Sequence, residues 1–268
     1  MNRKDCAYLI HSTPSYYYLL PLHITLVKRY AATCAWPIFV ATEVPEHPMI
    51  SYLISQWPDI QILPLTQDET LFFQCRKASA ERLPPEIQYV LPMQEDFLLE
   101  GRPMETVVQE ALILLDENPS ILSLRLMPCP GPKDTTCFGN TQWRLLDFSK
   151  DSYVFTYQAT LWRREAYSKF FAELLKLQDK QFGKGLTKKQ EIQIQVSYNL
   201  AEVGDGQTLL QSKIPGLHLA WPREGSHPNA VYLSPWPYRP TAVVKGELQE
   251  WAEELAYREE VPLRPSLR

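Results

Sequence analysis

Two adjacent carboxylates, Glu95 and Asp96, are the side chains whose type and placement point most directly to chemistry. They follow an apolar run at residues 89–93 that is typical of a buried strand. Mg²⁺ and Mn²⁺ prefer one or two carboxylates together with substrate phosphate oxygens. A metal held here would neutralise the charge that develops on a leaving pyrophosphate. The alternative is that one of the carboxylates caps the N-terminus of the segment that follows, and the spacing leaves both interpretations open.

Polar side chains also follow two earlier strand patterns. His11 and Ser12 come at the end of residues 6–11, and Thr42 and Glu43 come at the end of residues 36–42. Ligands of parallel α/β sheets bind at the carboxyl ends of the strands. We therefore expect these four residues to meet the carboxylate pair at one edge of a sheet.

The periodicity of the chain predicts the elements that must position these residues. In the first hundred residues, strands alternate with helices, which favours an α/β fold with a mostly parallel central sheet flanked by helices. The predicted strands span 6–11, 36–42, 59–63, 89–93, 121–126 and 152–160, and the predicted helices span 15–30, 49–56, 70–83, 103–117, 163–177 and 247–260. Residues 191–200 fit either a helix or a strand, and residues 128–140 and 214–240 are expected to be loops. Without repeats or linker composition, residues 1–268 are expected to form a single domain, with 1–100 as one half and 101–268 as the other.

The composition excludes several function classes. The chain has 268 residues with 23 Pro and only 10 Gly, and it contains neither Gly-x-Gly-x-x-Gly nor a Gly-rich loop followed by Lys-Ser/Thr. A net charge of −4 argues against a dedicated, sequence-independent nucleic-acid binder. Five widely spaced cysteines indicate reduced thiols and a cytoplasmic location. No stretch approaches the roughly 20 apolar residues that a membrane span needs.

The segment from Tyr89 to Phe97, YVLPMQEDF, resembles the metal-binding turn of GT-A-fold, nucleotide-sugar-dependent glycosyltransferases, in particular small bacterial and viral members. In that family an apolar strand ends in an acidic motif that holds Mn²⁺ or Mg²⁺ against the diphosphate of the donor. Residues 157–163, YQATLWR, and 242–246, AVVKG, resemble later segments of the same family. The resemblance implies a GT-A-like fold and transfer of a sugar from a nucleoside diphosphate to an acceptor hydroxyl.

The resemblance also implies roles for individual residues. Asp96 would be the metal ligand and a catalytic residue, with Glu95 beside it on the metal or the ribose. Arg76 would pair with a diphosphate oxygen, its alternative being a solvated helix face. The nucleotide would also contact the residues that end the first two strands, His11, Ser12, Thr42 and Glu43.

The second half supplies the expected acceptor side. Glu191 would be the catalytic base if transfer is inverting, its alternative being an ordinary surface carboxylate. Gln158 and Trp162 would bind the acceptor, although burial in the core is the commoner fate of a tryptophan. His227, in the Pro-rich segment, would be a further metal ligand, its alternative being solvent exposure.

Two rival functions stay open on sequence alone. Lysines 176, 180, 184, 188 and 189, together with Arg163 and Arg164, would form a landing surface if the acceptor were a hydroxymethylated pyrimidine in phage-type DNA. The alternative for the lysines is a solvated loop without a binding role. Gln94 occupies the first acidic position of the family motif, which keeps a non-catalytic nucleotide- or partner-binding protein as the other rival.

Overall fold

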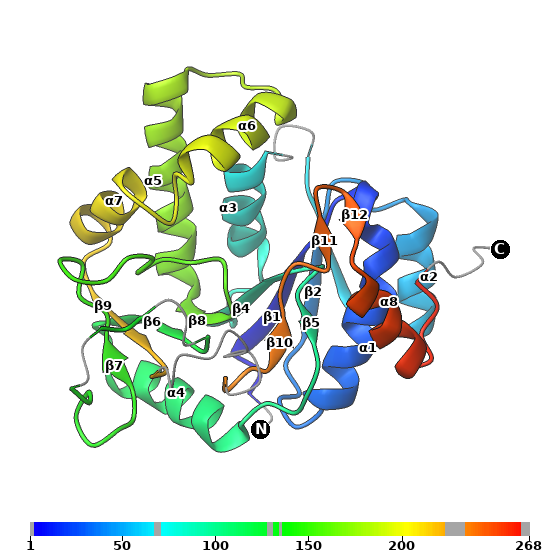
Figure 1. Cartoon of the computed structure of the whole chain (residues 1–268), viewed down its shortest axis with the longest axis horizontal. Coiled ribbons are helices and arrows are strands. Elements are labelled where there is room, and N and C mark those ends of the chain that lie inside the picture. The colour runs from blue at the N-terminus through cyan, green and yellow to red at the C-terminus, as the bar shows by residue number, and fades with distance from the viewer. Residues whose placement is uncertain (1–2, 67–70, 128–130, 134–135, 223–233, 264–268) are drawn as a thin grey trace.

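An eight-stranded sheet with helices on both faces forms the centre of the protein (Figure 1). The computed structural model describes residues 3–66, 71–127, 131–133, 136–222 and 234–263. The strand order is β3-β2-β1-β4-β8-β6-β9-β7. Strands β1 to β4, β6 and β9 run parallel to one another, whereas β8 and β7 run antiparallel to their neighbours. The predicted α/β fold with a mostly parallel sheet is confirmed.

The strands of this sheet come from both halves of the chain. The first half supplies β1 (Cys6–His11), β2 (Ile38–Thr42), β3 (Gln61–Pro64) and β4 (Tyr89–Gln94). The second half supplies β6 (Ile121–Arg125), β7 (Arg144–Leu145), β8 (Thr160–Arg163) and β9 (Leu217–Ala220). Outside the sheet, β5 (Leu98–Leu99) pairs with β10 (Tyr238–Arg239), and β11 (Val243–Val244) pairs with β12 (Glu247–Leu248).

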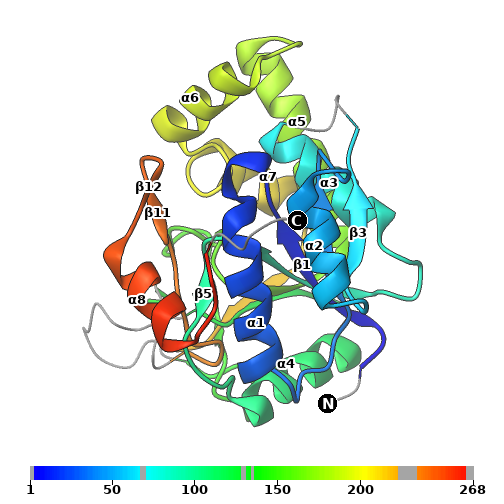
Figure 2. The same cartoon turned by 90° about the vertical axis from the view of Figure 1, so that its right-hand side faces the viewer.

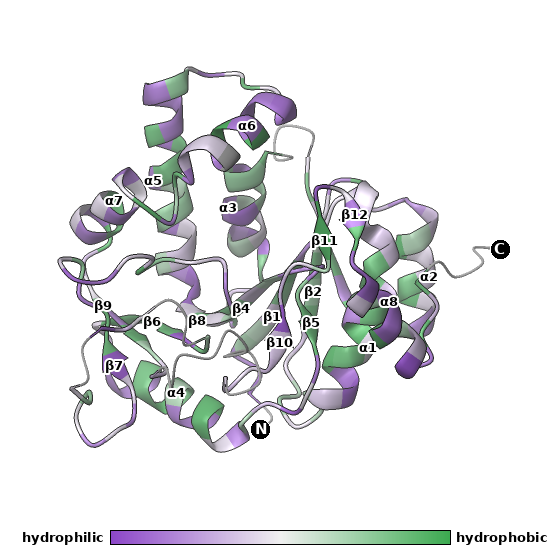
Figure 3. Ribbon diagram, viewed as in Figure 1, coloured by the Kyte–Doolittle hydropathy of each residue, from purple (hydrophilic) through white to green (hydrophobic). Residues whose placement is uncertain are grey.

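Alternation along the strands divides the core into two layers. On β1, Cys6, Tyr8 and Ile10 belong to one buried cluster, and Ala7 and Leu9 belong to the other, because successive strand residues point to opposite faces. The first cluster packs under α1 (Leu20–Tyr30), α2 (Pro48–Gln56), α4 (Glu105–Glu117) and α8 (Glu250–Arg258). The second packs under α3 (Phe72–Arg82), α5 (Arg164–Phe182) and α7 (Asp205–Lys213). Hydrophobic colouring is accordingly concentrated on the central strands and on α1 (Figure 3).

Local sequence signals set several helix boundaries. A 3-10 helix, η1 (Pro14–Leu19), precedes α1, so the predicted helix 15–30 begins with a tighter turn. Helix α3 ends at Arg82, just before the predicted stop at Pro84-Pro85. Residues 191–200, ambiguous in sequence, belong mainly to α6 (Lys188–Tyr198), because Thr187 and Gln190 form a capping box that starts a helix.

Two predictions about the second half are wrong. Residues 152–160 form a strand only at their last position, where β8 begins. The predicted loop 214–240 contains β9 and β10, and its aromatic side chains Trp221, Trp236 and Tyr238 are buried in the core. Helix α7 was not expected. The described aromatic residues of this segment therefore pack inward.

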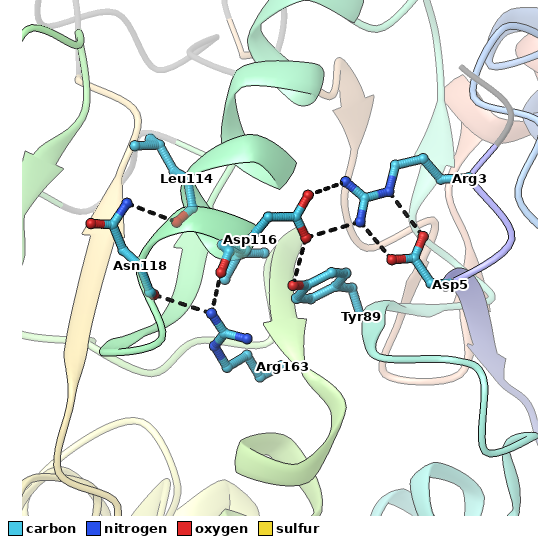
Figure 4. A network of polar contacts seen from close by, with 8 residues as sticks. Arg3, Asp5, Tyr89, Leu114, Asp116, Asn118 and Arg163 are labelled. Carbon is cyan, nitrogen blue, oxygen red and sulfur yellow. Dashed lines mark hydrogen bonds and ion pairs between the residues drawn. The ribbon is translucent and has the colours of Figure 1, made fainter.

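The amino-terminal end of the sheet is tied together by a polar network (Figure 4). Arg3 donates to both Asp5 and Asp116, and the Tyr89 hydroxyl donates to Asp116 at 2.8 Å. The Arg163 guanidinium donates to the carbonyls of Leu115, Asn118 and Ile121, at and beyond the end of α4. This network joins the start of the chain to β4, α4 and β8.

Candidate functional site

A cavity of about 320 Å³ opens at the carboxyl edge of the sheet. It lies where β1, β2 and β4 end and where α3 and α6 approach them, so residues from both halves of the chain line it. Its lining residues are His11, Ser12, Thr13, Ser15, Tyr16, Ala41, Glu43, Leu65, Phe72, Cys75, Arg76, Gln94, Glu95, Lys188, Glu191 and Ile192.

Six of the residues predicted to bind the donor or to catalyse transfer line this one cavity. Parallel strands bring His11, Ser12, Glu43 and Glu95 to the same edge, and the helices add the other two, Arg76 and Glu191. The expected convergence at the strand ends is thus present for most of the set. Thr42, Asp96, Gln158 and Trp162 are not among the lining residues, and His227 lies outside the described residues.

Two polar groups of β1 and its following turn face this cavity. The Ser12 hydroxyl is buried, and no described residue forms a hydrogen bond with it, so it is an unsatisfied polar group in the wall of the cavity. His11 shares a 2.8 Å hydrogen bond between its Nε2 atom and the Ser79 hydroxyl. Burial and the nearby Arg76 charge hold the pKa of His11 well below its usual range, so the ring is neutral at pH 7.

Arg76 is held rigidly in the wall of the cavity. Its guanidinium carbon lies 3.5 Å from the centre of the Phe72 ring and 5.2 Å from that of Tyr157. The guanidinium also donates to the Phe72 carbonyl at 3.1 Å, and the residue is only 4 % exposed. The alternative of a solvated helix face is therefore wrong. No described carboxylate forms an ion pair with Arg76. Its positive charge is therefore not neutralised by the protein and would attract an anion bound in the cavity.

Glu95 is the carboxyl group of this cavity that most needs a cation. Burial, and secondarily the charge of Asp96, raise its pKa to about 8. The opposing effects come from backbone hydrogen bonds and from the Arg76 charge. In the described part of the chain no cationic side chain forms an ion pair with it. A divalent cation would replace the missing hydration of this carboxylate, so the residue fits a metal site completed by phosphate oxygens.

Asp96 occupies a different environment from its neighbour. Burial raises its pKa to about 6, opposed first by a hydrogen bond from the backbone of Val243. Its own carbonyl accepts from the Ala242 N–H at 2.9 Å. The backbone of Asp96 is therefore paired with the segment that leads into β11, and Asp96 is not among the residues that line the cavity. Neither Asp96 nor Glu95 caps a regular helix, since the short strand β5 follows them.

Glu191 joins α6 to the start of α3. Its carboxylate accepts hydrogen bonds from the backbone N–H groups of Phe72 and Phe73, the first two residues of α3. These donors have no partner within their own helix, so an anion there is stabilising. The alternative of a surface carboxylate is wrong, because Glu191 is 1 % exposed. Its role as a catalytic base stays a prediction.

Several lining residues were not identified as site residues in the sequence. Lys188 forms a 2.8 Å ion pair with Glu43, which ties the first turn of α6 to the end of β2. Phe72, Cys75 and Ile192 supply apolar and thiol surface. Of these four residues, only Lys188 carried a signal in the sequence, through its place in the lysine run. The others have no distinctive spacing, and only tertiary packing brings them to the cavity.

Two predicted contacts, those of Thr42 and Trp162, are corrected by the packing. The Thr42 hydroxyl is fully buried and hydrogen-bonded to the Tyr17 hydroxyl, so it does not face a ligand. Trp162 is 1 % exposed and packs against Phe155, so stacking on an acceptor sugar is excluded by its burial in the core. Gln158 accepts a hydrogen bond from the Tyr238 hydroxyl at its amide oxygen, and its role in binding the acceptor stays a prediction.

The basic surface expected for DNA is also reduced. Both arginines have backbone partners: Arg163 as described above, and Arg164 on the carbonyls of Leu83 and Pro84. Among the lysines, Lys176 pairs with Glu173 and Lys188 pairs with Glu43. The arginines therefore fix α5 to the rest of the fold, and the predicted landing surface loses its two guanidinium groups.

The described residues hold no ready-made metal cluster and no membrane span. In the described ranges no group of three or more His, Cys, Asp or Glu side chains is arranged to hold a metal ion. Across the same ranges, none of the helices is both long enough and apolar enough to cross a bilayer.

Comparisons with known proteins find similarity in structure alone. No family model matches the sequence, and no curated protein matches it. Among solved structures, the chain is similar to S. aureus TarS 1–349 (13 % identity, TM-score 0.39, 65 % of this chain and 49 % of that one). It is also similar to the glycosyltransferase GlyE of Streptococcus pneumoniae, with 11 % identity and a TM-score of 0.44 over 98 % of this chain and 61 % of that one. A third similar structure is the mannosyltransferase PcManGT of Pyrobaculum calidifontis in complex with GDP-Man and Mn²⁺, with 12 % identity and a TM-score of 0.43 over 62 % of this chain and 46 % of that one. The chain thus spans about half the length of the TarS fragment.

Proposed function

We propose that this chain is a glycosyltransferase that binds a nucleoside diphosphate sugar in the carboxyl-edge cavity and transfers the sugar to an acceptor hydroxyl. The observation that carries this proposal is the convergence of Ser12, Arg76 and Glu95 on one cavity at the ends of parallel strands. An unpartnered hydroxyl, a fixed guanidinium and a desolvated carboxylate are the groups that a sugar, a diphosphate and its counter-cation would require. The scarcity of glycine supports the same assignment, because phosphate must then be bound by side chains and a cation.

The charges of the cavity support assistance by a divalent metal. Three carboxylates, Glu43, Glu95 and Glu191, line it beside two cations, Arg76 and Lys188, and Lys188 is already paired with Glu43. A diphosphate would therefore enter a site with too little positive charge of its own. Mg²⁺ or Mn²⁺, held by Glu95 and the phosphate oxygens, would supply that charge and stabilise the leaving diphosphate.

The chain's own side chains would bind and orient the donor. Arg76 would donate to a diphosphate oxygen from its fixed position on Phe72. Lys188 would exchange Glu43 for a phosphate oxygen, since both partners line the cavity. Glu191, if it acts as the base, would have to take the acceptor proton while it also holds the first N–H groups of α3.

Release of nucleoside diphosphate tests the proposal. Wild-type protein is incubated with a panel of UDP-, GDP-, CDP- and dTDP-sugars with Mn²⁺, and the released diphosphate is measured. Glu95→Gln removes the cavity carboxylate, and Glu86→Gln, an exposed carboxylate before the opposite end of the same strand, is the matched control. We expect release by the wild type and the control and loss of release in Glu95→Gln. Binding without release from any donor would instead support the non-catalytic rival.

A further inference from the structure

An aromatic ring from the second half of the chain packs against Arg76 in the wall of the cavity. The guanidinium carbon of Arg76 lies 5.2 Å from the centre of the Tyr157 ring and 3.5 Å from that of Phe72. The two rings meet edge to face, with their centres 5.1 Å apart. Phe72 belongs to α3 with Arg76, whereas Tyr157 precedes β8 and is not among the residues that line the cavity. The guanidinium is thus contacted by one ring from each half of the chain.

A single carboxylate holds the backbone that carries the Tyr157 ring. Glu202 lies in the turn between α6 and α7, and its Oε1 atom accepts hydrogen bonds from the Tyr157 N–H at 3.0 Å and the Thr156 hydroxyl at 2.7 Å. The Phe155 ring meets the Tyr157 ring edge to face, with the centres 5.1 Å apart. Figures 1 and 2 both show α6 beside α3, the helix that carries Arg76. The contacts of Tyr157 therefore join the segment before β8 to α3 and to the turn after α6.

The hydroxyl of Tyr157 takes no part in these contacts. It is buried, and among the described residues it has no hydrogen-bond partner. A buried hydroxyl without a partner costs free energy, so it does not explain the position of the ring. The ring itself makes the contacts with Arg76, Phe72 and Phe155. Phenylalanine at this position should therefore preserve them, and an aliphatic side chain should not.

A ring holds a guanidinium in a way that a carboxylate does not. The face of an aromatic ring attracts a cation, but it neither neutralises the charge nor occupies the N–H donors at the edge of the guanidinium. Among the described residues, the hydrogen bonds of this guanidinium come from Nη1 and go to the Phe72 carbonyl and the Cys75 sulfur. Its other N–H groups are left for an anion in the cavity. Because the guanidinium of Arg76 is already fixed, less conformational entropy is lost when that anion binds.

We infer that Tyr157 is a positioning residue for donor binding: its ring, held in place by Glu202, fixes the Arg76 guanidinium where it meets the diphosphate of the donor. This inference rests on the proposed function for the identity of the anion. It gives the segment before β8 a role in binding the donor, whereas the family resemblance implies that this segment, through Gln158, contacts the acceptor. Since Tyr157 acts through Arg76, its effect on donor affinity must disappear when Arg76 is removed.

A double-mutant cycle on nucleotide affinity tests this link. UDP, GDP, CDP and dTDP are first titrated calorimetrically into the wild type with Mn²⁺, and the nucleotide that binds most tightly becomes the probe. Its dissociation constant is then measured for Tyr157→Phe, Tyr157→Leu, Arg76→Met and the double variant of Tyr157→Leu with Arg76→Met. Phe170→Leu is the control, because it removes a fully buried ring of the same core cluster that packs against Phe155. Should Tyr157→Leu fail to fold, Glu202→Ala keeps the ring, releases its backbone and takes its place in the cycle.

The cycle separates a positioning role from a merely structural one. We expect Arg76→Met to weaken binding about 10-fold to 100-fold, the effect of a lost hydrogen bond to a charged group. Tyr157→Leu should weaken it about fivefold to tenfold, and Tyr157→Phe and Phe170→Leu by less than about twofold. In the Arg76→Met background, Tyr157→Leu should cause no further loss, and the smaller loss expected in Glu202→Ala should disappear there too.

Three results would overturn the inference and leave the proposed function intact. They are an additive loss in the double variant, wild-type affinity in Tyr157→Leu, and equal losses in Tyr157→Phe and Tyr157→Leu. If the wild type binds none of the four nucleoside diphosphates, the proposed function and this inference fail together.

Discussion

The two ends of the central sheet use the same kinds of charged residue in opposite ways. At the amino-terminal end, Arg3 lies between Asp5 and Asp116, and hydrogen bonds from Arg3 hold the pKa of both carboxyls below their usual range (Figure 4). At the carboxyl end, burial raises the pKa of Glu95 to about 8 and that of Asp96 to about 6. At the amino-terminal end the carboxylates are paired with a cationic side chain of the protein. At the carboxyl end Glu95 and Asp96 have no such partner among the described residues, so a ligand or a metal ion would have to supply the positive charge.

This difference separates stability from function. A carboxylate that gains a cation on folding stabilises the fold, whereas one that is buried without a cation opposes folding when it ionises. A cavity carboxylate of the second kind is a candidate binding group because a ligand or metal supplies what the fold omits. Five predictions, in order of decreasing effect, test whether the two ends differ in this way.

Removing the charge of Glu95 should have the largest effect on activity. Because Glu95→Gln leaves a bound cation without its protein carboxylate, we expect transfer to fall on the order of 100-fold or more. The measurement is nucleoside diphosphate release with the donor that the wild type accepts. Glu86→Gln should retain wild-type rates, and equal losses in the two variants would show that the effect is not specific to the cavity.

The pH dependence of stability should have opposite signs at the two ends. In the folded protein the pKa of Glu95 is raised to about 8, so the folded state keeps a proton that the unfolded state has already lost. The free energy of unfolding therefore falls as pH rises above the usual carboxyl range, and it levels off beyond about pH 8. Without metal we expect the melting temperature to fall on the order of 5 °C between about pH 6 and 9, and the Mn²⁺-induced rise to grow over the same range. In Glu95→Gln both trends should flatten. The lowered pKa values of Asp5 and Asp116 predict the reverse, a contribution lost on acidification below their usual range.

Glu191 lines the cavity at the carboxyl end, but its carboxylate has hydrogen-bond partners within the protein, as the carboxylates at the amino-terminal end do. Glu191→Ala exposes the start of α3 and should lower the free energy of unfolding by about 2 kcal/mol. Denaturant unfolding measures this loss. Glu191→Gln keeps an acceptor oxygen, so a folded but inactive Glu191→Gln would identify Glu191 as the base. Full activity in that variant would leave it with a structural role alone.

Lys188 should matter more for the donor than for the fold. Its ion pair with Glu43 is partly exposed, so Lys188→Ala should change the free energy of unfolding by less than about 0.5 kcal/mol. Loss of its contact with a phosphate should weaken donor binding about tenfold. Isothermal titration with the donor measures the affinity, and Lys176→Ala, which removes an exposed pair with Glu173, is the control. An unchanged affinity would remove Lys188 from the donor site.

Breaking the network at the amino-terminal end should have a modest effect on stability and none on the cavity. Asp116→Ala removes the acceptor of the Tyr89 hydroxyl and leaves Arg3 paired with Asp5 alone, and because the Arg3–Asp116 pair is partly exposed we expect a loss of about 1 kcal/mol. Asp59→Ala, which removes an exposed single ion pair with Lys28, should cost less. Metal response should be intact in both variants. A changed Mn²⁺ shift in Asp116→Ala would show that the two ends are coupled.

Much of the first half of the fold could be predicted because its signals are local. The run at residues 6–11 became β1 with the predicted bounds, since six consecutive buried residues leave a central parallel strand as the natural structure. The stop at Pro84-Pro85 acts through the backbone of its own residues. The second half was harder, because α7 carries little hydrophobic periodicity and the Pro-rich residues around β9 and β10 are typical of loops.

The sequence by itself determined that polar residues end successive parallel strands, and hence that His11, Ser12, Glu43 and Glu95 meet at one edge. That inference needs only the period of the strands and the parallel order of the sheet. The tertiary structure alone decided which of those groups face the cavity. The Thr42 hydroxyl is hydrogen-bonded to the Tyr17 hydroxyl, and Trp162 is buried in the core. These partners are distant in sequence and are brought close only by the fold. The direction of a side chain therefore depends on the partner that packing brings to it.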